Sequence, residues 1–153
     1  MIPNFFSKQK IPKDLPKGMQ DIIKKLKNTK SKEQCLKLAY KELSKNHNGA
    51  VFGAWRYMPR IFIRDINKLW EKKILVCTSL AFLLRILLIK SKKFEETDLK
   101  YKKTWSAYVF PHVILDVKIK NKWIHVDVWG KANGIKFGEY MTARRWISSI
   151  KSI

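Results

Sequence analysis

Apolar side chains recur every three or four residues along two early segments of the chain, which is the spacing of one helix face. A weak helix is predicted from Gly18 onward, and a stronger one over 31–49, where Ser31 can cap the first turn and the helix ends near Asn48 and Gly49. The positions that make these apolar faces are Ile22, Ile23, Leu26, Cys35, Leu36, Ala39 and Leu43. Prolines punctuate the preceding stretch 1–18, which predicts an extended N-terminal arm.

The strongest apolar run lies in residues 72–90, where Arg85 interrupts an otherwise uncharged stretch that follows Cys77. A helix that is apolar on nearly every face is covered by other elements on several sides. The run is shorter than the ~20 apolar residues of a membrane-spanning helix, so we expect a central core helix. Upstream, we expect a loop over 50–58 and a further helix that opens at Pro59. The apolar positions of that further helix are Phe62, Ile66, Leu69 and Trp70.

The pattern changes after a charged segment that we expect to be irregular up to Lys103. Three segments are rich in β-branched and aromatic residues, which is typical of strands. They cover residues 105–110, 112–119 and 122–130. The last two segments meet at Lys120 and Asn121 and predict an antiparallel hairpin. The whole pattern predicts one α+β domain over 1–153, with a final helix in the tail 137–153.

Charge narrows the choice of partners without changing the fold. The chain carries 33 Lys and Arg against 12 Asp and Glu, a net charge of +21, and basic residues occur in nearly every segment. A positive surface of this size attracts polyanions over a long range. The sequence contains no zinc-finger spacing, RNP-like aromatic motif or glycine-rich phosphate loop. We therefore favour a solvated lysine-rich surface, with weak, sequence-independent binding to polyanions.

The two cysteines, Cys35 and Cys77, are too few for a disulfide framework. The N-terminal residues lack the apolar core of a signal peptide, so a cytoplasmic location is expected. Cys35 lies on an apolar helix face, where a free cysteine commonly behaves as a small buried hydrophobe. The sequence does not indicate an oligomeric state.

Three polar residues stand out as candidates for chemistry: Cys77 at the start of the central helix, His112 after Pro111 at the start of a strand, and Asp127 on the next strand. A helix N-terminus and a nearby imidazolium both favour the thiolate form of a cysteine. A thiol nucleophile needs a base to carry protons, and the base needs a group that holds its tautomer. An antiparallel hairpin can place His112 and Asp127 side by side, facing the helix end.

Other residues compete for some of these roles. By strand alternation His125 shares a face with Asp127 and is a rival base. His47 is interpreted as a helix-end residue, and the hydroxyls of Thr78 and Ser79 have no base assigned to them. An acyl-transfer site also needs donors for an oxyanion. The backbone N–H of Cys77 is one, and the sequence leaves three unranked candidates for the second, namely Trp70, Trp55 and Tyr57.

The order Cys77, His112, Asp127 resembles the transglutaminase-like core, a relative of papain-type cysteine proteases. In that family a cysteine opens a buried helix, and a strand-opening histidine is followed four positions later by an acidic residue. A tryptophan then precedes the catalytic aspartate by four positions. Here His112 is followed by Asp116, and Trp123 precedes Asp127. The resemblance covers about residues 30–130, although the family often has glycine and an aromatic residue where this chain has Val76 and Ile114.

The resemblance implies a transglutaminase-like fold, with N-terminal helices and a central cysteine-bearing helix packed on an antiparallel sheet. It also implies a Cys77–His112–Asp127 triad that attacks a protein or peptide amide and forms a thioester, which water or an amine resolves. We expect no cofactor and no metal, because the chain lacks the four zinc-binding cysteines of the peptide N-glycanase relatives and the acidic calcium loops of animal transglutaminases. The alternative is a noncatalytic basic module of the same fold that binds RNA or anionic envelope polymers.

Overall fold

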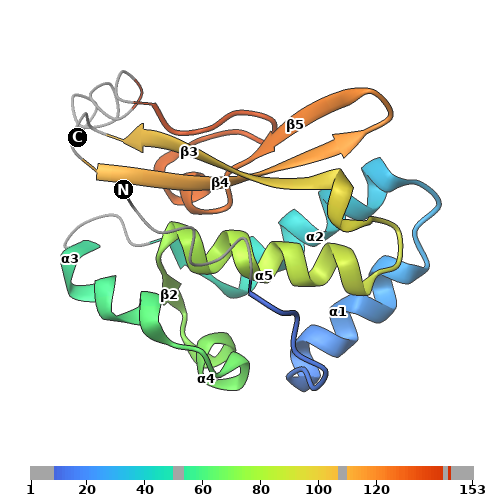
Figure 1. The fold of residues 1–153 in the computed structure, drawn as a ribbon, viewed down its shortest axis with the longest axis horizontal. Helices are drawn as coiled ribbons and strands as arrows, with labels where there is room; N and C mark the ends of the chain where they lie inside the picture. The colour runs from blue at the N-terminus through green and yellow to red at the C-terminus, as the bar shows by residue number, and fades with distance from the viewer. Residues whose placement is uncertain (1–8, 50–53, 107–109, 143–144, 146–153) are drawn as a thin grey trace.

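The computed structural model describes residues 9–49, 54–106, 110–142 and 145. Its helices gather on one side, and a three-stranded antiparallel sheet in the order β3-β4-β5 covers them on the other (Figure 1). A second, two-stranded sheet joins β1 to β2. The described chain is therefore a mixed α and β structure, with helix α5 lying between the larger sheet and the other helices.

The described residues form five α-helices, three 3₁₀ turns and five strands. The helices are α1 (Lys17–Lys27), α2 (Lys32–Asn46), α3 (Ala54–Tyr57), α4 (Ile66–Glu71) and α5 (Cys77–Lys90). The 3₁₀ turns are η1 (Met58–Phe62), η2 (Glu96–Asp98) and η3 (Trp129–Asn133). The strands are β1 (Asn48–Gly49), β2 (Ile74–Leu75), β3 (Leu99–Ser106), β4 (Phe110–Ile119) and β5 (Lys122–Val126).

Helix α5 is the centre of the hydrophobic core. Every residue from Ser79 to Leu88 is buried, which confirms the prediction of a helix covered on several sides. It packs against β4 on one side and against α1 and α2 on the other. Burying one leucine side chain contributes about 1.5–3 kcal/mol, so this helix supplies much of the stabilisation. Along the described chain, no helix combines the length and apolar composition needed to cross a membrane.

The charged residue inside α5, Arg85, ties three segments together. Its guanidinium donates two hydrogen bonds to the Glu96 carboxylate, at 2.7 and 3.1 Å, and a third to the backbone oxygen of Gln9 at 3.0 Å. A planar guanidinium suits this two-pronged contact with a carboxylate. Arg85 therefore fastens the N-terminal arm and the η2 turn to the core helix without leaving its charge unpaired.

The N-terminal helices form much as the sequence predicts. In α2 the Ser31 side chain accepts a hydrogen bond from the Gln34 N–H, which is the expected N-cap. Cys35 is fully buried and contacts the Ser91 hydroxyl, so its assignment to the core is confirmed. The chain after α2 forms β1, which pairs in parallel with β2. This pairing fixes where the chain enters α5, because Cys77 lies two residues beyond Leu75.

The predicted hairpin is present as β4 and β5. Leu115 is paired with Tyr101 of β3 and with Val126 of β5. Leu115 and Val126 belong to the same buried core as α5, so this face of the sheet covers the helix. The hairpin turn contains Lys120 in the left-handed region, with φ at +55°. A two-residue loop with positive φ matches the twist of the strands that it joins.

The helix expected to open at Pro59 is wrong in its extent. Pro59 lies in the 3₁₀ turn η1, and α4 begins separately at Ile66 because the Asp65 side chain caps it by accepting hydrogen bonds from the Asn67 and Lys68 backbone N–H groups. Phe62, assigned to the apolar face, is 74% exposed. The expected loop over 50–58 is also wrong in part, since α3 begins at Ala54, whereas 50–53 lie outside the described residues.

The strand bounds differ from the sequence pattern in three places. Strand β3 begins at Leu99, inside the segment expected to be irregular. The predicted strand 105–110 is wrong, because β3 ends at Ser106 and β4 begins at Phe110, with 107–109 outside the described residues. Strand β5 ends at Val126, since Trp129 already lies in the η3 turn. The predicted C-terminal helix over 137–153 is wrong for residues 137–142, which are not helical, and beyond Thr142 only Arg145, which is helical, is among the described residues.

The buried Leu84 and the exposed Phe62 should differ in how much stability is lost when each is replaced by alanine. Leu84→Ala in α5 removes a side chain with no exposed surface and should lower the free energy of unfolding by about 2–5 kcal/mol, because it leaves a cavity. Phe62→Ala should change it by no more than about 0.5 kcal/mol, since the ring is mostly solvent-exposed. Urea denaturation followed by circular dichroism measures both. Equal losses in the two variants would contradict the described packing.

Candidate active site

The first candidate residue, Cys77, is the first residue of α5 and is half-buried. The preceding Val76 makes no side-chain cap to the helix, because its hydrocarbon side chain cannot accept a hydrogen bond. The first turn of a helix has backbone N–H groups without intrahelical partners. These groups carry the positive end of the helix dipole, which favours a negative charge at this position. Cys77 is therefore placed where a thiolate or an oxyanion is stabilised.

The structure brings the three predicted site residues together. His112 near the start of β4 and Asp127 just after β5 are both buried, and the His112 Nε2 lies 2.8 Å from the Asp127 Oδ2. The Cys77 side chain lies close enough to the His112 ring to raise the pKa of the imidazole. Because Nε2 is engaged by the carboxylate, Nδ1 is the ring nitrogen left for the thiol. The imidazole thus bridges sulfur and carboxylate.

Backbone groups hold the Asp127 carboxylate in place. Its Oδ1 accepts a hydrogen bond from the Gly130 N–H at 2.8 Å, and its Oδ2 accepts one from the Met141 N–H at 2.9 Å. The side chain is only 1% exposed, and a buried carboxylate requires such partners. The carboxylate therefore has a fixed orientation toward His112, set by the η3 turn and by the segment that returns over the sheet.

Two opposing effects determine the protonation of His112. Burial alone lowers the pKa of its imidazole, because desolvation penalises the charged ring. The interactions of the ring with Asp127 first and with Cys77 second outweigh burial and raise the pKa of His112 to about 10. At neutral pH the ring is therefore an imidazolium between two acidic groups, and it can donate a proton.

Trp129 is a residue of the site that the sequence analysis missed in this role. Its ring lies 4.9 Å from the His112 ring, centroid to centroid, at an angle of 55°, and the residue is buried. Gly49 of β1 makes room for it, since a Cβ at Gly49 would lie 2.7 Å from the Trp129 Cδ1. An apolar ring beside a buried ion pair excludes water and strengthens the electrostatic attraction. The available signal was a tryptophan two positions after Asp127.

The rival base, His125, has a different partner. Its Nδ1 lies 2.7 Å from the Asp116 Oδ1, and its ring meets the Tyr140 ring edge-on at 4.9 Å. Asp116 is buried, whereas the His125 side chain is 31% exposed. The acidic residue that follows His112 by four positions therefore pairs with His125. The two histidines belong to two separate carboxylate pairs on adjacent strands.

Two of the three candidates for a second oxyanion donor, Trp70 and Tyr57, have side chains among the described residues. Trp70 packs edge-on against His47, and its Nε1 lies beside Gly18, where a Cβ would be only 2.7 Å away. Its indole thus packs at the junction of α4 with the start of α1. The Tyr57 ring stacks under the Arg60 guanidinium at 4.6 Å. The side chain of Trp55 lies outside the described residues. The Cys77 N–H is therefore the donor with the clearest position.

His47 is more deeply placed than a residue that only ends a helix. It is 3% exposed, and its Nδ1 lies 2.7 Å from the Lys72 backbone oxygen. Its Nε2 has no hydrogen-bond partner among the described residues. Burial lowers the pKa of this ring, which favours its neutral form in the folded chain. In the described part of the chain, no group of three or more His, Cys, Asp or Glu side chains is arranged to hold a metal ion.

Comparison with known proteins gives a likeness of fold. No family model matches the sequence, and no curated protein matches it. The described chain is similar to the crystal structure of a TGase, with a TM-score of 0.50 and 14% sequence identity. The match covers 80% of this chain and 33% of that one, so this chain spans about a third of the length of its structural neighbour. The arrangement of helices and sheet is therefore shared with part of a TGase.

The raised pKa of His112 makes stability depend on pH in a defined direction. The charged ring stabilises the folded chain fully below its ordinary pKa of 6.5, and this contribution fades as pH rises toward 10. The difference in unfolding free energy between the wild type and His112→Gln should therefore be largest near pH 6 and shrink steadily up to pH 10. Urea titrations across this range measure it.

His47→Gln is the matched control for this pH series. Burial lowers the pKa of His47, so below about pH 6.5 the unfolded chain gains a proton that the folded chain rejects. The wild type should lose stability relative to His47→Gln as pH falls, which is the opposite trend from His112→Gln. A flat difference for His112→Gln between pH 6 and 10 would refute the imidazolium bridge.

Gly130 should tolerate no side chain, because a Cβ there would lie 2.7 Å from the Asp127 Oδ2 and 3.0 Å from the Ile135 Cβ. Gly130→Ala should displace the carboxylate and lower the free energy of unfolding by about 1–3 kcal/mol, as overpacking does. Ala132→Ser, in the same turn but exposed, should change it by less than about 0.5 kcal/mol. Thermal and urea unfolding at pH 7 compare the two. Unchanged stability in Gly130→Ala would mean that the turn adapts freely.

Proposed function

We propose that this chain is a transglutaminase-like thiol enzyme that cleaves or transfers the acyl group of a protein or peptide amide. The observation that supports the proposal is the 2.8 Å contact of the buried His112 imidazole with the Asp127 carboxylate, with the Cys77 side chain close to the same ring. Nucleophile, base and orienting carboxylate in this connectivity serve acyl transfer on unrelated folds. The likeness of fold to part of a TGase supports the same reading.

The first half-reaction follows from the charges in the site. The Cys77 thiolate attacks the amide carbonyl carbon, and the oxyanion that forms is stabilised by backbone N–H groups at the start of α5. The His112 imidazolium, whose pKa is raised to about 10, gives its proton to the leaving nitrogen. The C–N bond breaks, the amine departs, and the acyl group remains on sulfur as a thioester.

The second half-reaction regenerates the thiolate. His112, now neutral, takes a proton from water or an amine as that molecule attacks the thioester carbonyl. The C–S bond breaks, the acid or new amide leaves, and the imidazolium and thiolate are restored. We propose water as the principal acceptor, because the Cys77 side chain is partly open to solvent. Asp127 holds the ring in the tautomer and orientation that both steps need.

Thiol reactivity tests the proposal and uses the second cysteine as an internal control. The chain is alkylated with iodoacetamide over a range of pH, and each cysteine is followed by peptide mass spectrometry. Cys77 should react well at pH 6–7, because the His112 imidazolium stabilises its thiolate. Cys35 should stay unmodified while the chain is folded, because it is fully buried. Hydrolysis of a generic amide or ester substrate is measured in parallel.

Three variants assign the roles. His112→Ala should abolish the fast labelling of Cys77 at neutral pH and lower turnover by roughly 10²–10⁴-fold, as loss of a general base does. His125→Ala should spare both, since His125 pairs with Asp116. Asp127→Asn should be intermediate, because the ring remains but is held in the wrong tautomer.

Two outcomes would contradict the proposal. Loss of Cys77 labelling in His125→Ala, with His112→Ala unaffected, would move the base to the other histidine. Labelling of Cys77 that is slow and indifferent to both histidine substitutions would favour the noncatalytic basic module.

A further inference from the structure

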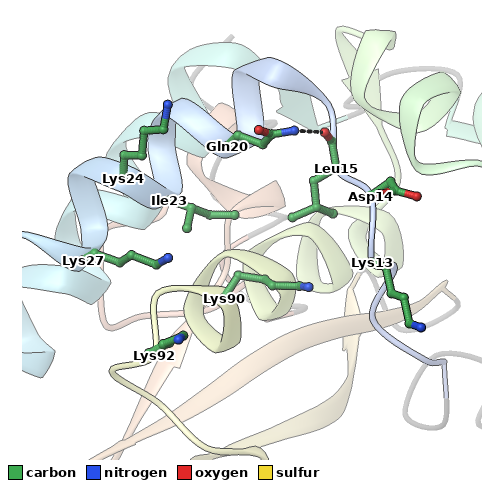
Figure 2. Close-up of a pocket in the computed structure, with 9 residues that line it drawn as sticks. All are labelled: Lys13, Asp14, Leu15, Gln20, Ile23, Lys24, Lys27, Lys90 and Lys92. Atoms are coloured by element: carbon green, nitrogen blue, oxygen red, sulfur yellow. Dashed lines mark hydrogen bonds between the residues drawn. The ribbon is translucent and has the colours of Figure 1, made fainter.

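A pocket of about 380 Å³ lies at the far end of α5 from Cys77. It is open to solvent and is bordered by the N-terminal arm, one face of α1 and the C-terminal end of α5 (Figure 2). Its charged lining consists of Lys13, Asp14, Lys24, Lys27, Lys90 and Lys92. Figure 2 shows Lys27 and Lys90 extending toward the same hollow, with Lys13 of the arm across from them.

Four of the five lysines of this pocket carry a charge that no carboxylate among the described residues neutralises. Lys24 reaches Asp21 only at 3.9 Å. Within the described ranges, no ion pair joins the other four lining lysines to a carboxylate. Lysines elsewhere are paired, such as Lys25 with Glu42 at 3.2 Å and Lys32 with Asp98 at 2.7 Å. Five ammonium groups against the one carboxylate of Asp14 give the lining a net charge of +4.

The backbone at Lys92 is a second feature of this end of α5. Lys92 has φ at +61°, in the left-handed region that glycine ordinarily takes at the end of a helix. A residue with a Cβ is disfavoured there. The chain nevertheless places a lysine at this position, one of the five that line the pocket. The strained conformation thus presents a charge that glycine would not supply.

The walls of the pocket are built in advance of any ligand. The Gln20 side chain donates a hydrogen bond to the Leu15 backbone oxygen at 2.7 Å, which ties the arm to α1 (Figure 2). The hydrogen bond from Arg85 to Gln9 ties the arm to α5. Leu15 and Ile23 give the lining an apolar part beside the lysines. The backbone of these walls is therefore held in place before a ligand binds, which lowers the entropic cost of binding.

We propose that this pocket binds a small anionic ligand through its triphosphate group. A net lining charge of +4 matches a ligand with several adjacent negative groups better than a single carboxylate or phosphate. Lysine ammonium groups bind phosphate oxygens as point charges from several directions. The volume lies within the range of small-molecule pockets, roughly 300–1,000 Å³. A nucleic acid strand instead needs a basic groove that follows its backbone.

The site is independent of the proposed acyl-transfer chemistry. Cys77 and Lys90 are the two ends of α5, which at 1.5 Å per residue lie ~20 Å apart. A ligand in the pocket therefore does not touch the triad. Binding should persist in Cys77→Ser, so failure of either proposal leaves the other intact.

Isothermal titration calorimetry on the full chain at about 0.15 M salt tests the pocket. Inorganic tripolyphosphate should bind with a stoichiometry of one, and at least about tenfold more tightly than orthophosphate, a difference of about 1.4 kcal/mol. The double variant Lys27→Gln, Lys90→Gln should weaken tripolyphosphate binding by about tenfold or more. The control Lys41→Gln, Lys45→Gln removes the same charge from exposed positions of α2 and should change the affinity by less than about twofold.

Further titrations, with ATP and with single-stranded RNA, identify the kind of molecule that carries the phosphates. ATP that binds more tightly than tripolyphosphate would assign the pocket to a nucleotide whose remainder contacts Leu15 and Ile23, whereas equal affinities would assign it to a free oligophosphate. Equal weakening in the two double variants would overturn the proposal, because diffuse surface charge then explains binding. Preferential binding of a single-stranded RNA, insensitive to Lys27→Gln and Lys90→Gln, would overturn it as well.

Discussion

The buried carboxylate of Asp127 is the constraint on which the site depends. A charge with 1% of its side chain exposed is tolerated only with partners, and three segments supply them: His112 from β4, the Gly130 N–H from η3 and the Met141 N–H from the returning chain. Each of these segments is therefore held in register by the same oxygen atoms. Displacing any one of them leaves a buried charge under-satisfied, so the carboxylate couples the geometry of the site to the stability of the fold.

The other half of the site is set by the path of the chain into α5. The parallel pairing of β1 with β2 fixes the entry, and the absence of a capping side chain at Val76 leaves the first helical turn open. The same β1 contains Gly49, whose lack of a Cβ admits Trp129. Two residues of backbone pairing thus position the thiol and support the ring that shields His112. A short sheet of this kind buries little surface, but it fixes the positions of the residues around it.

The sequence predicts those elements that are specified locally. Helical spacing and the Ser31 cap define α2, an apolar run defines α5, and the turn at Lys120 and Asn121 defines the hairpin. It also brought Cys77, His112 and Asp127 into one hypothesis, because strand and helix starts can be located from the pattern. It failed at Pro59, where the Asp65 cap interrupts a helical spacing. The donors to Asp127 were not predictable, since backbone N–H groups leave no trace in residue type.

The two ends of α5 carry opposite partial charges of the helix dipole, and different residues accompany each end. At the positive end, Val76 leaves the first turn uncapped, so its N–H groups are available to stabilise negative charge on sulfur or on an oxyanion. At the negative end, Lys90 is the basic residue of the last turn and Lys92 follows it two positions later, so both charges have the sign that the dipole favours there. That attraction stabilises the helix but needs only one or two cations. The five lysines around the pocket are more than the helix dipole needs. Their excess charge requires either solvent counterions or an anionic ligand.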